Sequence, residues 1–206
     1  MSAPPKSRRA EYAEATRQAI IEAARRLFAS KGYFATTVEE IAQQARVAPA
    51  TVYAVGGGKQ GLMRTLVDVW STAPIIAESL ERQSMLTDPG ELLNHAAEAV
   101  RTMREEFGDI IRVVLATAPH NPEVHDALEV ATERYRAAVA ALAERLATVG
   151  GLPAGMSPGE ATDILWFYFG YSSLFTLVDD NGWSFDRAQR WLVDQAAAAL
   201  HLKSGN

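Results

Sequence analysis

The stretch VEEIAQQARVAPATVYAV, residues 38–55, decides the fold of this chain. Its spacing predicts two short helices, at about 38–45 and 49–55, joined by a sharp turn. Helices that approach so closely need a small residue between them, and Ala42 supplies it. The segment therefore predicts a helix-turn-helix, whose second helix enters the major groove of DNA.

The residues that bound these helices sharpen the prediction. Thr37 can cap the first helix, and Glu40 lies three residues on, as in a capping box. The turn usually needs a glycine with positive φ, yet Arg46 stands there, at a cost of about 1 kcal/mol. A cation here can recover part of that cost by reaching a phosphate, although a merely tolerated surface arginine fits equally well.

The rest of the chain is also helical in pattern, and no alternating strand pattern of useful length is found. Apolar spacings of three and four from Ala13 to Lys31 mark a first helix that Gly32 ends. A helix follows Lys59 and is kinked or broken at Pro74. Further helices are expected at about 88–106, 108–118, 121–148, 158–179 and 184–202. The prediction is an all-α fold of about nine helices.

Composition narrows the class of protein. The chain has 206 residues, 48% of them hydrophobic, and no cysteine, which excludes disulfides and thiolate metal sites. No stretch of about 18 apolar residues is uninterrupted, so we expect an unexported, cytoplasmic protein without a membrane partner. The net charge is −5, but residues 1–64 carry 10 Lys and Arg against 5 Asp and Glu. A basic N-terminal third on an acidic body is typical of a polyanion-binding module attached to another domain, or of a solvated charged face.

Residues 19–62, AIIEAARRLFASKGYFATTVEEIAQQARVAPATVYAVGGGKQGL, resemble the DNA-binding domain of the tetracycline-repressor (TetR) family of transcriptional regulators. The order AxxLF, GY, paired threonines, IA, short turn, TVY and Lys before Leu carries the resemblance. It implies an N-terminal three-helix DNA-binding domain followed by a helical ligand-binding and dimerisation domain. The expected boundaries are a basic flexible arm over 1–12, the DNA-binding domain over 13–62 and the C-terminal domain over 63–206.

The resemblance implies a set of DNA contacts. Phosphate contacts, which set register, would come from the hydroxyl and amides at Thr37 and from Tyr53 and Lys59. Base reading would fall to the exposed side of residues 48–55, which lacks Arg, Asn and Gln and so depends on Thr51, on methyl contacts and on DNA shape. The expected DNA-binding residues are Thr37, Arg46, Pro49, Ala50, Thr51, Tyr53 and Lys59. The basic run Lys6 to Arg9 can add minor-groove contacts, or be an ordinary basic tail.

The C-terminal half carries expectations about partners. The run DILWFYFGYSSLFTLV, residues 163–178, is apolar on every face, which a second subunit would cover. The resemblance implies a homodimer through the last two helices, about 158–179 and 184–202, and a ligand site among the middle helices. Candidate lining residues are Met103, Phe107, Ile111, Val114, Trp166 and Phe169, although plain core packing explains each one taken singly better than a ligand does. Few charges fall in these stripes, so an apolar or aromatic effector is expected.

Two enzymatic alternatives have little support. The run GGGK lacks the nucleotide-binding pattern G-x-x-x-x-G-K-[ST], because the first glycine would be Tyr53 and Gln60 has no hydroxyl for Mg²⁺. His120 and His125 are five residues apart, not the four of a helical zinc site. We therefore expect no catalytic activity, cofactor or metal.

The interpretation is a ligand-responsive repressor that binds a palindromic operator as a dimer and is released by a small apolar effector. Departures from the family pattern keep an alternative open. Ala48 replaces the usual helix-capping serine, and Gly56 replaces a phenylalanine that packs the second helix of the motif. The loss of this phenylalanine should loosen the connection between that helix and the next one. With Arg46, these residues fit a ligand-binding dimer of the same fold with weakened or lost DNA binding.

Overall fold

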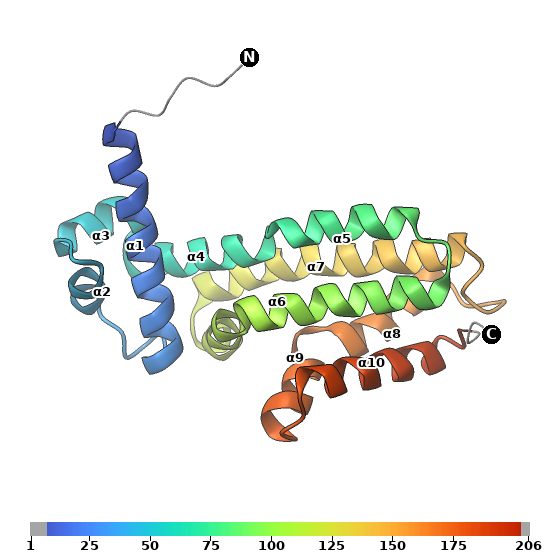
Figure 1. The fold of residues 1–206 in the computed structure, drawn as a ribbon. Helices are drawn as coiled ribbons and strands as arrows, with labels where there is room; N and C mark the ends of the chain where they lie inside the picture. The colour runs from blue at the N-terminus through green and yellow to red at the C-terminus, as the bar shows by residue number, and fades with distance from the viewer. Residues whose placement is uncertain (1–7, 203–206) are drawn as a thin grey trace, which may run out of the picture. The chain divides into compact units, whose positions relative to one another are not determined.

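The computed structural model describes residues 8–202, and this range contains helices and no strand. The prediction of an all-α fold is confirmed (Figure 1). The α-helices in order are α1 (Arg8–Lys31), α2 (Val38–Ala45), α3 (Pro49–Gly56), α4 (Gly58–Ser71), α5 (Pro74–Met85), α6 (Pro89–Thr117), α7 (Pro122–Thr148), α8 (Pro158–Phe169), α9 (Tyr171–Phe175) and α10 (Phe185–Ala199). Residues 1–7, which include most of the expected basic arm, lie outside the described range.

The helices form two compact units. The first contains the described residues up to Val69 together with Asp109–Glu129, and the second contains Trp70–Gly108 and the residues from Val130 onward. Helices α4, α6 and α7 contribute residues to both units. The domain boundaries expected from the sequence stay predictions.

The first unit is built on the apolar stripe of α1. Ile20 and Phe28 are fully buried, and α1 packs against both α2 and α3 (Figure 1). Gly32, with a φ of 82°, ends α1 as expected. The helix begins five residues before the expected Ala13, because Arg8–Tyr12 are helical but exposed and carry no apolar stripe for periodicity to detect.

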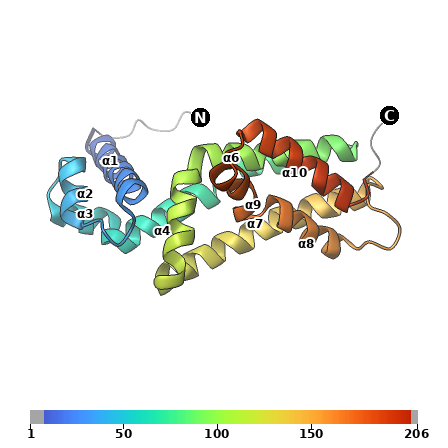
Figure 2. The ribbon, with the colours of Figure 1, turned by 90° about the horizontal axis from the view of Figure 1, so that it is seen from below.

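Five α-helices, α6 to α10, contribute side chains to the core of the second unit. Leu92 and Leu93 of α6, Leu142 and Leu146 of α7, and Leu165 of α8 are all buried in one cluster. Helix α10 packs against α8, and Figure 2 shows the two helices side by side. Burial of this many apolar side chains is the main stabilising contribution to the unit.

Three helix breaks differ in how well the sequence predicted them. Pro74 does break the chain, and it starts α5. Gly108 does not, so the two helices expected at 88–106 and 108–118 are the single helix α6. A helical glycine costs only about 1 kcal/mol, and burial of the neighbouring Ile110 and Ile111 outweighs it. The helix expected at 158–179 is instead interrupted at Gly170, where a Cβ would lie 2.5 Å from the Trp166 carbonyl oxygen, and it ends in a π-helical turn at Thr176–Asp180.

Candidate nucleic-acid interface and ligand cavity

The N-terminus of α2 is closed by the predicted capping box. Thr37 Oγ1 accepts a hydrogen bond from the Glu40 amide at 3.2 Å, and Glu40 Oε2 accepts one from the Thr37 amide at 3.0 Å. Glu40 also pairs with Lys31, and this hydrogen bond, followed by that from the Thr37 amide, lowers the pKa of the Glu40 carboxyl. Thr37 is exposed, so a group from outside can reach its hydroxyl, which also bonds to the Glu40 carboxyl.

The turn between α2 and α3 has the geometry that the sequence predicted. Arg46 has a φ of 58° and a ψ of 43°, in the left-handed region. Its amide donates to the Gln43 carbonyl at 3.1 Å, and the Val47 amide donates to the Ala42 carbonyl at 2.9 Å. This is a Schellman turn that normally ends in glycine. The Arg46 side chain is exposed beside the start of α3.

Helix α3 buries one side chain, and its other residues are exposed or half-buried. Val52 is fully buried, whereas Tyr53 is 59% exposed. Pro49 and Ala50 are exposed and Thr51 is half-buried. The predicted base-reading residues therefore lie at the start of a short helix with one buried anchor.

Tyr53 and Lys59 lie on either side of the glycine run. Lys59 Nζ lies 4.6 Å from the centre of the Tyr33 ring, a cation–π distance. Burial lowers the pKa of Lys59, and the charge of Glu40 partly opposes this change. The Tyr53 ring lies so close to Gly58 that a Cβ there would be 3.1 Å from Cε1. Both expected phosphate anchors are thus packed at the joint between α3 and α4.

The joint itself is tight, which revises the expectation of a loose one. Gly57 and Gly58 both have positive φ, at 65° and 71°. A Cβ on Gly61 would lie 2.0 Å from the Gly56 carbonyl oxygen, and one on Gly56 would lie 2.6 Å from Leu62 Cδ2. These glycines are required because backbone and side chains approach each other closely. An aromatic residue at Gly56 would have to displace a side chain that is 1% exposed.

A cavity of about 110 Å³ lies within the second unit. Its walls come from the end of α4, from α5, α6 and α7, and from the last residue of α8. Of the six expected lining residues, Met103 and Phe169 line it. The other four do not.

Those four residues have other surroundings. Ile111 and Val114 are fully buried in the first unit. Phe107 is half-buried, and Trp166 packs edge-on against Tyr135 at 5.3 Å between ring centres. The wall formed by α5 was not expected from the sequence, although Ile75, Ile76, Ser79, Leu80 and Gln83 recur with a spacing close to four and so mark one helix face.

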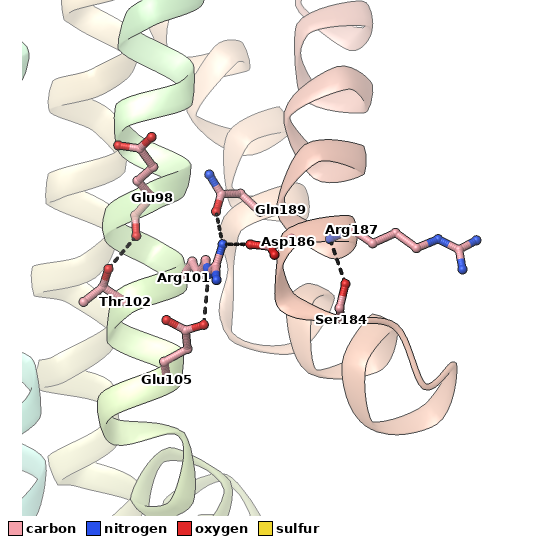
Figure 3. Close-up of polar contacts among 8 residues, drawn as sticks. All are labelled: Glu98, Arg101, Thr102, Glu105, Ser184, Asp186, Arg187 and Gln189. Carbon is pink, nitrogen blue, oxygen red and sulfur yellow. Dashed lines mark hydrogen bonds and ion pairs between the residues drawn. The ribbon is translucent and has the colours of Figure 1, made fainter.

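Polar contacts join α10 to α6 in this unit (Figure 3). Arg101 of α6 donates to Glu105 at 2.9 Å and also pairs with Asp186 in the first turn of α10. The hydrogen bond to Glu105, more than that to Asp186, raises the pKa of Arg101. Ser184 caps α10 by accepting from the Arg187 amide at 3.3 Å. Two large apolar side chains on these last helices remain exposed, Phe167 at 72% and Trp191 at 41%.

The structure gives the two histidines of the metal alternative no shared site. His125 pairs with Glu129 at 3.4 Å, and no group of three or more potential metal ligands occurs within residues 8–202. No helix in the described part of the chain is both long and apolar enough to cross a bilayer.

Comparisons with known proteins agree with this architecture. Residues 20–66 match the family described as bacterial regulatory proteins, tetR family. The chain is 38% identical over 88 residues to the HTH-type transcriptional regulator HbdR of Aromatoleum sp. (strain CIB), which is 42% of this chain and 37% of that protein. It is 42% identical over 57 residues to the uncharacterized HTH-type transcriptional regulator YvkB of Bacillus subtilis (strain 168), which is 28% of this chain and 30% of that one.

The matches to these two relatives span about a third of their length. Structural similarity extends further along the chain. NalD, the secondary repressor of the MexAB-OprM multidrug efflux pump in Pseudomonas aeruginosa, superposes with a TM-score of 0.71 at 26% identity, over 95% of this chain and 100% of NalD.

Proposed function

Because this chain belongs to the tetR family of bacterial regulatory proteins, we propose that it acts as a DNA-binding transcriptional regulator rather than an enzyme, and that it represses its target genes. The observation that carries the proposal is the exposed face of α2 and α3. There the capped N-terminus at Thr37, the left-handed turn at Arg46 and the exposed Tyr53 lie in one helix-turn-helix. We propose that Thr37, Arg46, Tyr53 and Lys59 contact phosphates, and that Pro49, Ala50 and Thr51 face the bases.

A homodimer through α8 and α10 is the second part of the proposal. The exposed Phe167 and Trp191 belong to these helices, and a dimer through α8 and α10 would remove both side chains from water. A two-fold dimer carries two copies of α3, so the operator would be approximately palindromic. We expect the protein to act in the cytoplasm, where it can reach DNA.

The third part of the proposal is that the cavity of the second unit receives a small effector. A ligand can release the operator only if it binds the DNA-free state more tightly than the DNA-bound state. The helices that line the cavity include α4 and α6, which also contribute residues to the first unit. A ligand that moves the cavity-facing residues of α4 or α6 would therefore act on a helix that continues into the first unit.

One observation favours the alternative of a ligand-binding dimer with weakened DNA binding. The N-cap of α3, Ala48, makes no side-chain hydrogen bond, so the recognition helix starts without the usual support. A binding experiment with DNA distinguishes the two functions.

Fragments of the organism's own DNA should be selected on the purified protein and binding to the selected site measured between 50 and 200 mM salt. We expect a sequence-selective complex whose log affinity falls linearly with log salt. Lys59→Met should reduce that slope by about 0.9 for each phosphate that the lysine neutralises. Arg82→Met is the matched control, because Arg82 is exposed on α5 in the other unit. A complex without sequence selectivity would favour the alternative. If Lys59→Met and Arg82→Met showed the same slope of log affinity against log salt, Lys59 would not contact a phosphate.

A further inference from the structure

The cavity of the second unit has an uneven distribution of charge. Most of its wall is apolar, with Trp70, Ile76, Leu80 and Met103 among the larger side chains. Two arginines, Arg104 and Arg134, also line it, and none of the described residues in the wall is Asp or Glu. The wall therefore offers positive charge and no negative charge from residues 8–202 to anything inside.

Arg104 is a buried cation without an anionic partner among the described residues. It is 3% exposed, and Nη2 donates to two neutral oxygens, the Tyr135 hydroxyl at 3.4 Å and the Gly170 carbonyl at 3.3 Å. Its Nε is buried and has no hydrogen-bond partner within the part of the chain that the structure describes. A buried charge left in this state is costly unless an ion of opposite sign joins it.

The aromatic residues around Arg104 stabilise it but do not neutralise it. The guanidinium carbon lies 5.5 Å from the ring centres of Tyr135 and Tyr171 and 5.6 Å from that of Phe175. Cation–π contacts of this kind favour the charged form. Burial raises the pKa of Tyr171 to about 12 and also raises that of Tyr135, so neither phenol becomes an anion at neutral pH.

A second polar side chain in the same wall is also incompletely bonded. Gln83 is 7% exposed, and its Nε2 donates to Ser79 Oγ at 3.0 Å. Its Oε1 is buried and accepts no hydrogen bond from any residue between 8 and 202. Buried amides in proteins are almost always satisfied, so both Gln83 and Arg104 have capacity for a ligand that enters the cavity.

We propose that this cavity binds a small amphipathic carboxylate, whose acid group pairs with Arg104 while its apolar part lies against α5 and α6. A donor group on the ligand would satisfy Gln83 Oε1. The pairing would be charge-assisted and suited to the planar fork of a guanidinium, which matches a carboxylate. The proposal replaces the purely apolar effector expected from the sequence, and it rests on the proposed function only in treating the cavity as the effector site.

The size of the cavity limits the ligand. An apolar cavity of about 150 Å³ accepts a benzene ring, so a space of about 110 Å³ fits a single ring or a short acyl chain with modest side-chain movement. One buried guanidinium matches one carboxylate. A phosphate group would bring more negative charge and more acceptor oxygens than Arg104, the buried arginine of the wall, satisfies.

The test compares acids with their uncharged amides by calorimetry on the full-length protein at pH 7, without DNA. The probes are phenylacetate, benzoate and hexanoate, each against the corresponding amide. We expect at least one acid to bind at least tenfold more tightly than its amide. If no acid binds better than its amide, the proposal is wrong.

Variants then assign the preference to Arg104. Arg104→Met should remove the preference for the acid and leave binding of the amide within about threefold, and Arg82→Met should change neither. Arg104→Met removes a buried charge that is costly to desolvate but also loses the hydrogen bonds to Tyr135 and Gly170, so we expect this variant to fold and to melt near the temperature of the wild type. If that variant does not fold, the comparison of acids with amides still decides whether the cavity prefers an anion. It can be made on the wild type and on Gln83→Leu, which keeps Arg104. An acid preference that survives in Arg104→Met would place the anion site elsewhere. Because the assay contains no DNA, a failure to find an operator leaves its outcome unaffected.

Discussion

Replacing Arg46 should separate the strain of the turn from its proposed role at the DNA. Arg46 adopts a φ of 58° with an exposed side chain. A side chain in the left-handed region costs about 1 kcal/mol, which glycine would relieve. Glycine also increases the conformational entropy of the unfolded chain, and this offsets about 0.5 kcal/mol of the gain. We therefore expect Arg46→Gly to raise the free energy of unfolding by about 0.5 kcal/mol, which corresponds to a melting temperature about 1–2 °C higher.

The same substitution should weaken DNA binding. If the guanidinium contacts one phosphate per subunit, its removal lowers the slope of log affinity against log salt by about 0.9 per subunit and weakens binding at 0.1 M salt by almost tenfold per subunit, or about 60-fold for the dimer. Arg46→Asn is the matched variant, because asparagine tolerates left-handed backbone and carries no charge. Both variants should show the same reduction in slope. The measurements are thermal unfolding and a salt titration of binding to the selected operator.

Two results would refute this reasoning separately. A less stable Arg46→Gly protein would mean that the turn is not strained by its side chain. An unchanged salt slope in both variants would mean that Arg46 is a surface arginine without a phosphate contact.

Two further changes test the ends of α3 and the attachment of α1. Ala48→Ser should supply the missing N-cap of α3 and stabilise the protein by about 1 kcal/mol, whereas Ala50→Ser, one residue inside the helix, should not; urea unfolding measures both, and equal effects would contradict the capping argument. Asp109 accepts two hydrogen bonds from Arg25 at 2.8 Å. Burial acts most strongly and raises the pKa of Asp109, but the hydrogen bonds from Arg25 and the Ile110 amide, with the charge of Arg25, outweigh burial and lower it. A carboxyl with a lowered pKa adds stability above its unfolded pKa and loses it as the pH falls through its folded pKa, so below about pH 4 the wild type should lose more stability than Asp109→Asn; parallel urea-midpoint curves for the two proteins between pH 6 and pH 2 would show that the pair contributes nothing.

The helix-turn-helix was predictable because its determinants are local. The capping box of Thr37 and Glu40 and the positive φ at Arg46 both follow from a few consecutive residues. The family resemblance rests on the same short segment. Physical rules for caps and turns apply within one or two helical turns, and here they were sufficient.

The cavity was not predictable in the same way, because it depends on which helix faces meet. Met103 and Phe169 line the cavity, but Ile111 and Val114 have the same apolar character and are buried in the first unit. Periodicity shows that a side chain is buried and does not show against what. Arg104 was missed because a charged residue is normally assigned to the surface.

A weak signal for Arg104 did exist in the sequence. It follows Val100 by four residues, and both residues line the cavity from one face of α6. A charge on an apolar helix face is therefore a candidate for a buried functional cation, provided that no acid follows at the spacing of an ion pair on the same face.

The stability of α3 connects the two interpretations of the DNA-binding unit. A helix of eight residues is not stable by itself, and α3 buries only Val52. It lacks a side-chain N-cap, and it follows a turn that carries strain at Arg46. Its position comes from packing against α1 and α2 and from the closely packed glycines that follow it, where the Gly56 carbonyl leaves no room for a side chain on Gly61. The departures at Arg46 and Ala48 make the recognition helix easier to melt, whereas Gly56 and Gly61 hold its end against α4. Weak DNA binding, if found, would then be an ordering cost that Ala48→Ser reduces, and not a defect of the contact surface.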